Sequence, residues 1–171
     1  FGGSDAWSAE FIGLWPSEKR DSLAKVLFSN KFLPNGNPEG IALSGWRYRI
    51  GDGSRDQIPG NGLSAGNWYK ATQCPLNTDG TYNWSKQAGN VWMIRKAREH
   101  GVPSFTGWTD SPPYFMTKSG YVFRETGVTS GYNLKTDWYD DFANYLADVS
   151  KHFENEGIQF DVISPVNEPQ W

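Results

Sequence analysis

The sequence predicts an α/β fold in which strands and helices alternate along the chain. Short segments with strand patterning end near residues 7, 50, 108 and 166, and segments with helical periodicity lie between them. The joints from helix to strand are short, whereas the segments that follow the strands are long and polar. This alternation indicates a parallel sheet with its site on the loops after the strands. Four such units make half of an eight-stranded TIM (β/α)8 barrel.

The first unit is expected at the start of the chain. Phe1–Trp7 has the pattern of a strand and its following turn. A helix then begins at Ser17, a suitable N-cap, and carries Leu23, Val26 and Leu27 on one face.

The second and third units are separated by a long loop. Residues 40–50 form the second strand, and 51–83 show no sustained periodicity, which in a compact domain is typical of functional or disordered segments. A helix is expected over Trp84–His100, with Gly101 placed to end it. The third strand, Val102–Trp108, runs into a second polar loop.

The clearest helix lies in the fourth unit. Its apolar residues fall at i, i+4, i+7, i+8, i+11 and i+15, which defines a single face: Trp138, Phe142, Tyr145, Leu146, Val149 and Phe153. Thr136 or Asp137 can cap this helix, and Gly157 can end it. The last strand is Phe160–Val166.

The composition excludes several functions. The 171 residues suffice for one domain, and a net charge of −3 leaves no basic surface for nucleic acid. No apolar run reaches the roughly 18 residues that cross a bilayer, and no signal peptide is visible. The single cysteine, Cys74, excludes an intramolecular disulfide. Nine Trp, eight Tyr and ten Phe suit either a sugar-stacking surface or an aromatic core.

Asn167-Glu168-Pro169 is the strongest candidate for chemistry, because it places a carboxylate just after the fourth strand. A solvated loop carboxylate is the alternative for this tripeptide alone. The alternative fold, a doubly wound nucleotide-binding sheet, lacks its glycine-rich phosphate turn. Asp52-Gly53-Ser54-Arg55-Asp56 resembles a calcium loop only faintly and is interpreted as a polar turn.

Four motifs at successive strand ends carry a resemblance to a known family. Phe1–Trp7, Trp46–Gly51, Asp110–Met116 and Ile163–Pro169 together resemble glycoside hydrolase family 30, and within it most closely the branch of endo-β-1,6-galactanases. The resemblance covers most of the chain. It implies that residues 1–171 are the N-terminal half of a (β/α)8 catalytic domain, a fragment whose upstream segment is missing.

The resemblance also implies roles for three side chains. Glu168 is the expected general acid and later base of a retaining mechanism, in which two carboxyls lie about 5–5.5 Å apart. Asn167 is expected to bond the sugar 2-hydroxyl, and Arg47 to orient the nucleophile. The structural alternatives are that Asn167 caps its own turn and that Arg47 is paired with a charge at the barrel mouth without a catalytic contact. The nucleophile is a glutamate ending strand seven, beyond this chain.

Five further residues at or after strand ends are candidates for binding sugar. The aromatic rings of Trp7, Trp108 and Tyr114 can stack against sugar rings in the subsites. The carboxylates of Asp5 and Asp110 can accept hydrogen bonds from sugar hydroxyls. A packing ring or a turn-forming Asp is at least as common at such positions.

The expected partner is a β-linked polysaccharide or oligosaccharide, with β-1,6-galactan first and the linkages of β-1,6-glucanases, xylanases and glucosylceramidase-like enzymes as alternatives. No cofactor or metal is expected. The remainder of the barrel is needed to complete the site, and a fragment that only binds sugar, or is inert, is a second hypothesis. By resemblance, the protein acts in an extracellular or periplasmic location.

Overall fold

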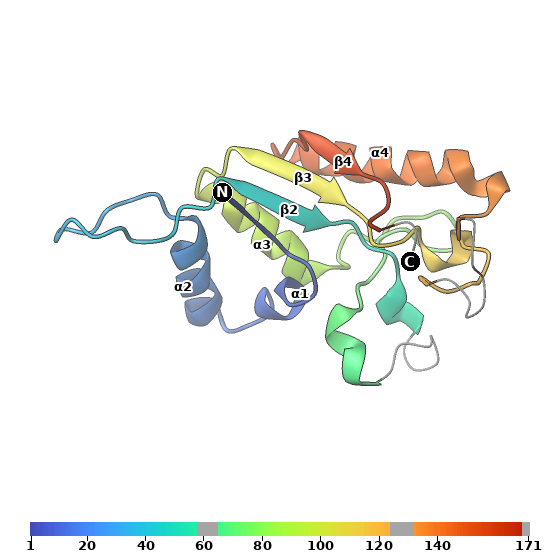
Figure 1. Ribbon diagram of the computed structural model, residues 1–171, viewed down its shortest axis with the longest axis horizontal. Helices are drawn as coiled ribbons and strands as arrows, with labels where there is room; N and C mark the ends of the chain where they lie inside the picture. The colour runs from blue at the N-terminus through green and yellow to red at the C-terminus, as the bar shows by residue number, and fades with distance from the viewer. Residues whose placement is uncertain (58–64, 124–131, 169–171) are drawn as a thin grey trace.

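A four-stranded parallel sheet forms the frame of the molecule. The computed structural model describes residues 1–57, 65–123 and 132–168. The strands are β1 (Gly2–Ser4), β2 (Gly45–Arg49), β3 (Ser104–Trp108) and β4 (Val162–Ser164), and they pair in chain order. All three pairings are parallel, as expected from the alternation of strands and helices. The polypeptide therefore has the α/β architecture of the first four units of a barrel (Figure 1).

Four α-helices accompany the sheet. They are α1 (Ala9–Ile12), α2 (Ser17–Phe28), α3 (Ala88–Glu99) and α4 (Tyr139–Asn155). Short 3-10 turns, η1 (Ser54–Gln57), η2 (Ala65–Lys70), η3 (Tyr114–Met116) and η4 (Thr136–Trp138), lie in the segments that lead from the strands to α3 and α4. None of the helices in the described ranges is long and apolar enough to cross a membrane.

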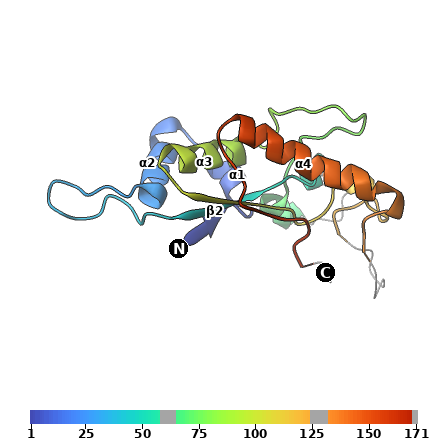
Figure 2. The ribbon, with the colours of Figure 1, turned by 90° about the horizontal axis from the view of Figure 1, so that it is seen from above.

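The helices lie on one face of the sheet and leave the other face bare (Figure 2). Alternate residues of a strand point to opposite faces. Trp46 and Tyr48 therefore join Phe105 in the core, where they meet side chains of the helices, such as Phe28 of α2 and Phe153 of α4. Residues 47, 49 and 108 belong to the opposite face, which in a closed barrel is the interior.

The two helix-to-strand joints that look alike in sequence have the same geometry. Gly101 and Gly157 both have positive φ, at 83° and 77°, as a C-terminal glycine requires. In each joint the next residue donates its N–H back across the helix end, from Val102 to Ala97 and from Ile158 to Phe153. Both helices therefore end in the same hydrogen-bonded turn before the next strand.

Helix α4 follows its predicted pattern. Phe142, Tyr145, Leu146, Val149 and Phe153 are all buried. The predicted caps are wrong, since Thr136 and Asp137 form η4, and the residue before the helix, Trp138, makes no side-chain capping bond.

Three other details differ from expectation. Ser17 begins α2 but is not its cap, because Pro16 occupies that position. Val26 is 50% exposed, because α2 packs through Ala24 and Phe28 instead. The second strand starts at residue 45 rather than 40, because the N–H groups of Ile41 and Leu43 donate to the Val26 and Leu27 carbonyls at the end of α2. Before this, residues 31–39 form a protruding hairpin with Phe32 paired to Pro38.

Helix α1 was not expected from the sequence and depends on two glycines. Its C-terminal residue Gly13 lies against Gly89 at the start of α3. A Cβ on Gly89 would come within 1.7 Å of the Glu10 carbonyl oxygen, and one on Gly13 within 2.2 Å of the Gly89 oxygen. Contact between two backbones leaves no side chain that could move aside.

We predict that Gly89→Ala lowers the free energy of unfolding by roughly 3 kcal/mol, because overpacking against backbone forces α1 and α3 apart. Gly45→Ala is the matched control, since a Cβ there would come no closer than 3.8 Å to a neighbouring atom. Urea unfolding of both variants checks this, and equal stabilities would contradict the predicted clash.

Candidate functional site

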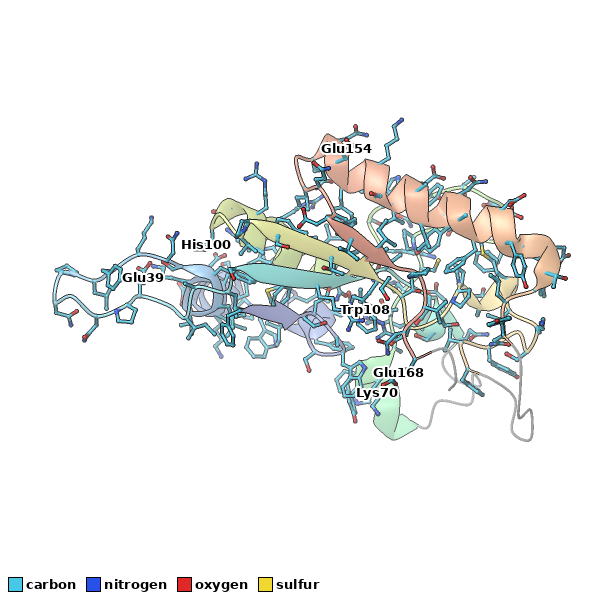
Figure 3. The ribbon with its side chains drawn as sticks, turned by 45° about the horizontal axis from the view of Figure 1, so that its top comes forward. Glu39, Lys70, His100, Trp108, Glu154 and Glu168 are labelled. Carbon is cyan, nitrogen blue, oxygen red and sulfur yellow. The ribbon has the colours of Figure 1, made fainter. Side chains whose placement is uncertain are left out.

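The carboxyl ends of the strands gather the residues that sequence analysis selected. Figure 3 shows Trp108, Glu168 and Lys70 grouped at this end, with Glu39 and His100 at the opposite end. The three predicted residues Arg47, Trp108 and Asn167 come together on the bare face. The Arg47 guanidinium lies 4.0 Å from the centre of the Trp108 ring and donates to Asn167 Oδ1 at 3.1 Å.

Asn167 and Glu168 are held in place by Thr109, the residue that follows β3. The Thr109 N–H donates to the Ser164 carbonyl at 3.1 Å, and the Thr109 carbonyl accepts from the Asn167 N–H at 2.8 Å. The Thr109 hydroxyl donates to the Pro165 carbonyl. The ends of β3 and β4 are thereby fastened together, so the bend that carries Glu168 is set by the neighbouring strand.

Glu168 projects from this bend as an exposed carboxylate. Its φ is +45°, a conformation that is uncommon for a residue with a side chain and that often marks a functional site. Burial is the main cause that raises the pKa of the Asp110 carboxyl, and the nearby Glu168 contributes to the same shift. Pro169, the last residue of the predicted tripeptide, lies outside the described residues.

Arg49, which sequence analysis did not select, organises the charges beneath this bend. It is 4% exposed, and its guanidinium reaches Asp52 at 2.9 Å, Asp110 at 2.7 Å and the Lys70 carbonyl at 2.5 Å. Its backbone N–H donates to Asp5 Oδ1 at 2.7 Å. Because strand residues two apart share a face, the pair Arg47 and Arg49 was the signal that could have found it.

Asp110 occupies the mouth of this network. Its side chain is 29% exposed, and burial raises the pKa of its carboxyl, while Arg49 acts in the opposite direction. Asp110 is partly exposed, so its contact with a ligand stays a prediction, and the ion pair with Arg49 gives it a structural role.

Asp5 lies deeper than the predicted sugar contact requires. It is fully buried, and its second oxygen accepts from the Asn90 amide at 3.0 Å. Burial raises the pKa of Asp5 to about 7, although Asn90 and Arg49 counteract the shift. This placement argues against direct contact with a sugar and gives Asp5 the task of holding β1 to β2 and α3. Asn90 is 85 residues away in the chain and offers no sequence signal.

The two other predicted rings lie at opposite margins of the site. Trp7 is 45% exposed, has a positive φ of 68°, and has Lys70 Nζ 4.6 Å from its ring centre. Tyr114 is half-buried in η3, where its ring contacts Gly53 and stands edge-on to Phe115. Trp7 is therefore available for stacking, whereas Tyr114 is mainly part of the loop packing.

The segment after β2 supports the network as a polar turn, in agreement with the sequence interpretation. Asp52 Oδ1 accepts from both the N–H and the hydroxyl of Ser54, at 2.9 and 2.6 Å. The turn fixes the carboxylate that faces Arg49.

A barrel wall with an acid after its fourth strand is typical of glycoside hydrolases, and comparison with known proteins identifies the family. The model of O-glycosyl hydrolase family 30 matches residues 1–171, so the chain belongs to that family. It is 29% identical to an endo-β-1,6-galactanase of Hypocrea rufa over 99% of this chain and 36% of the relative.

Two solved structures are similar to the chain. A conserved exported protein from Bacteroides fragilis matches with a TM-score of 0.87 and 40% identity, over 95% of this chain and 33% of that one. The catalytic domain of the family 30 xylanase C from Talaromyces cellulolyticus matches with a TM-score of 0.66 and 27% identity, over all of this chain and 36% of that one. The chain thus spans about a third of the length of these relatives.

We predict that stability depends on pH through Asp5. Its pKa is higher in the folded protein, about 7, than its ordinary value of 3.8. The folded state therefore binds the extra proton between these values. The stabilisation is present below about pH 4 and is lost as the pH rises to about 7. Asp5→Asn cannot ionise, so the wild type should lose stability relative to this variant over that interval.

Thermal unfolding of both proteins from pH 4 to pH 8 measures this difference. Asp79→Asn is the control, because the exposed Asp79 carboxyl bonds to Thr81, which lowers its pKa rather than raising it. A difference between wild type and Asp5→Asn that stays constant with pH would show that Asp5 is ionised throughout.

Proposed function

We propose that this chain supplies the acid/base half of the active site of a retaining endo-glycoside hydrolase, with β-1,6-galactan as its substrate. The observation that carries the proposal is the placement of Glu168. It stands exposed after β4, on a bend that Thr109 fastens to β3, and next to an asparagine that Arg47 orients. A rigid support for an exposed carboxyl is what proton transfer to a glycosidic oxygen needs.

Each neighbour has a proposed task in that reaction. Glu168 protonates the leaving oxygen and later deprotonates the water that releases the sugar. Asn167 uses its amide N–H groups for the 2-hydroxyl of the sugar, because its oxygen already accepts from Arg47. Trp108 lies beneath Arg47 and is 2% exposed, so we assign it to positioning this pair rather than to a wide sugar contact.

The nucleophile is proposed to be a glutamate at the end of a seventh strand, in a continuation of the polypeptide. Residues 1–171 are then the N-terminal half of the catalytic domain, and the bare face of the sheet lines the barrel. Within the described ranges, Asp52 and Asp110 form ion pairs with the Arg49 guanidinium, whereas Asp5 is fully buried and accepts from the Arg49 backbone N–H. A nucleophile must be free to attack carbon, which the two ion pairs and the burial of Asp5 oppose.

The substrate proposal draws support from the Hypocrea rufa relative, whose name is endo-β-1,6-galactanase and which aligns over nearly the whole chain. Xylan is the second candidate, because a family 30 xylanase is 27% identical. An extracytoplasmic location is also proposed, supported by the similar Bacteroides fragilis protein that is described as exported. A fragment that only binds sugar is the alternative for the 171 residues taken alone.

We predict that Glu168→Gln in the full-length protein lowers kcat on β-1,6-galactan about a thousandfold, because no proton reaches the leaving oxygen. Hydrolysis is followed by reducing-sugar release, with xylan and β-1,6-glucan in parallel. With a 2,4-dinitrophenyl glycoside, whose leaving group needs no proton, the covalent intermediate should still form and give a burst. Glu154→Gln, an exposed position on α4, is the control.

Full activity of Glu168→Gln on the polymer would refute the assigned role. Turnover of galactan by the 171 residues alone would refute the proposal that the second carboxyl lies in the continuation.

A further inference from the structure

A pocket lies on the helix side of the sheet, separate from the site on the bare face. Its volume is about 290 Å³, close to the lower end of the roughly 300–1,000 Å³ typical of small-molecule sites. Helix α4, the segment 76–82 and η3 form its walls. In Figure 2 the green segment near residue 80 runs beside α4, on the side away from the bare face.

Aromatic rings from three separate segments line the pocket. Tyr82, Phe115 and Trp138 are all half-buried, so each presents part of its ring to the pocket and part to the core. Phe115 and Trp138 stand edge to face, with centroids 6.1 Å apart. Tyr82 is fixed from outside, because its hydroxyl donates to Asp148 at 2.9 Å. The rings therefore form a rigid apolar wall.

One face of α4 supplies the polar groups. Asp141, Asn144 and Asp148 follow at i, i+3 and i+7, so they share the stripe of the helix that borders the pocket. Asp141 and Asn144 are exposed, and their side chains form no hydrogen bond or ion pair with other parts of the chain that the structure describes. They are free to meet a ligand.

The chemistry of this lining selects a neutral, hydroxyl-rich ligand. Sugar hydroxyls can donate to the carboxylate of Asp141 and exchange bonds with the amide of Asn144, while an apolar sugar face lies on Trp138. The lining residues include the carboxylates of Asp141 and Asp148 but no Lys or Arg, which favours a neutral ligand over an anion such as a phosphate or uronate. Two nearby lysines, Lys86 and Lys135, are already bonded to the lining residues Asn77 and Phe115.

We propose that this pocket is a second carbohydrate-binding site, which holds a neutral sugar unit of the polymer at a distance from the catalytic bend. Helix α4 begins at the end of the molecule where the strands finish, and its first half lines the pocket, so the pocket lies toward the end that carries Glu168, on the helix side of the sheet. A polymer bound there stays near the cleft between cleavages, and this raises its effective concentration. The choice of a polysaccharide as the ligand rests on the proposed function, whereas the pocket itself does not.

The test measures polymer retention and chemistry separately in the full-length protein. Retention is measured by affinity electrophoresis through gels that contain β-1,6-galactan, in the Glu168→Gln background. Trp138→Ala and the double variant Asp141→Ala, Asn144→Ala should each bind the polymer about fivefold more weakly. Tyr139→Ala is the matched control, because Tyr139 is 47% exposed beside Trp138 but does not line the pocket.

In the active background, kcat/KM of the same variants on a short aryl glycoside should equal that of the parent. The double variant guards against misfolding, since both its positions are exposed. Retention equal to that of the parent would overturn the proposal, as would an equal loss on polymer and short glycoside. Parallel gels that contain xylan or β-1,6-glucan distinguish an incorrect choice of polymer from an incorrect site. If the substrate is another polymer, the pocket variants lose retention on that polymer's gel.

Discussion

The buried guanidinium of Arg49 is the interaction on which the rest of the site depends. It bridges Asp52, Asp110 and the Lys70 carbonyl, and its backbone N–H is tied to Asp5, so the segments that follow β1, β2 and β3 meet at one residue. A buried cation without partners would cost several kcal/mol, and each carboxylate alone would cost a similar amount. The segments are therefore stable in this arrangement only together, and the loops after β1, β2 and β3 are not independent of one another.

Above this network, the bend that carries Glu168 is held mainly by hydrogen bonds to main-chain groups. Thr109 supplies three bonds to the end of β4, and Arg47 supplies one to Asn167. The position of Glu168 is therefore set by main-chain geometry at the end of β3, while the Arg47 guanidinium holds the neighbouring Asn167 side chain.

The sequence predicted the order, type and parallel direction of the elements because hydrophobic periodicity and glycine ends are local signals. The buried face of α4 and the glycines at 101 and 157 followed this logic. Helix α1 was not predicted, since four residues carry too little periodicity and its stability comes from contact with Gly89. The site was predicted in part, through motifs at strand ends. The roles of Arg49 and Asn90 were not predicted, because Arg49 depends on the distant Asp110 and Asp5 as well as on the nearby Asp52, and Asn90 depends on the distant Asp5. The burial of Asp5 cannot be predicted from its neighbours in the sequence.

The hairpin at residues 31–39 has a practical consequence. Figure 1 shows the hairpin protruding from the molecule. In Figure 3 its residue Glu39 lies at the end of the strands opposite Glu168. The only native thiol, Cys74, is buried, and burial raises its pKa to about 12, so it reacts poorly with labelling reagents. A cysteine introduced at Asn35 would consequently be the single reactive thiol among these 171 residues. A protein attached to a surface through that point would present the strand ends that carry Glu168 outward, in one orientation.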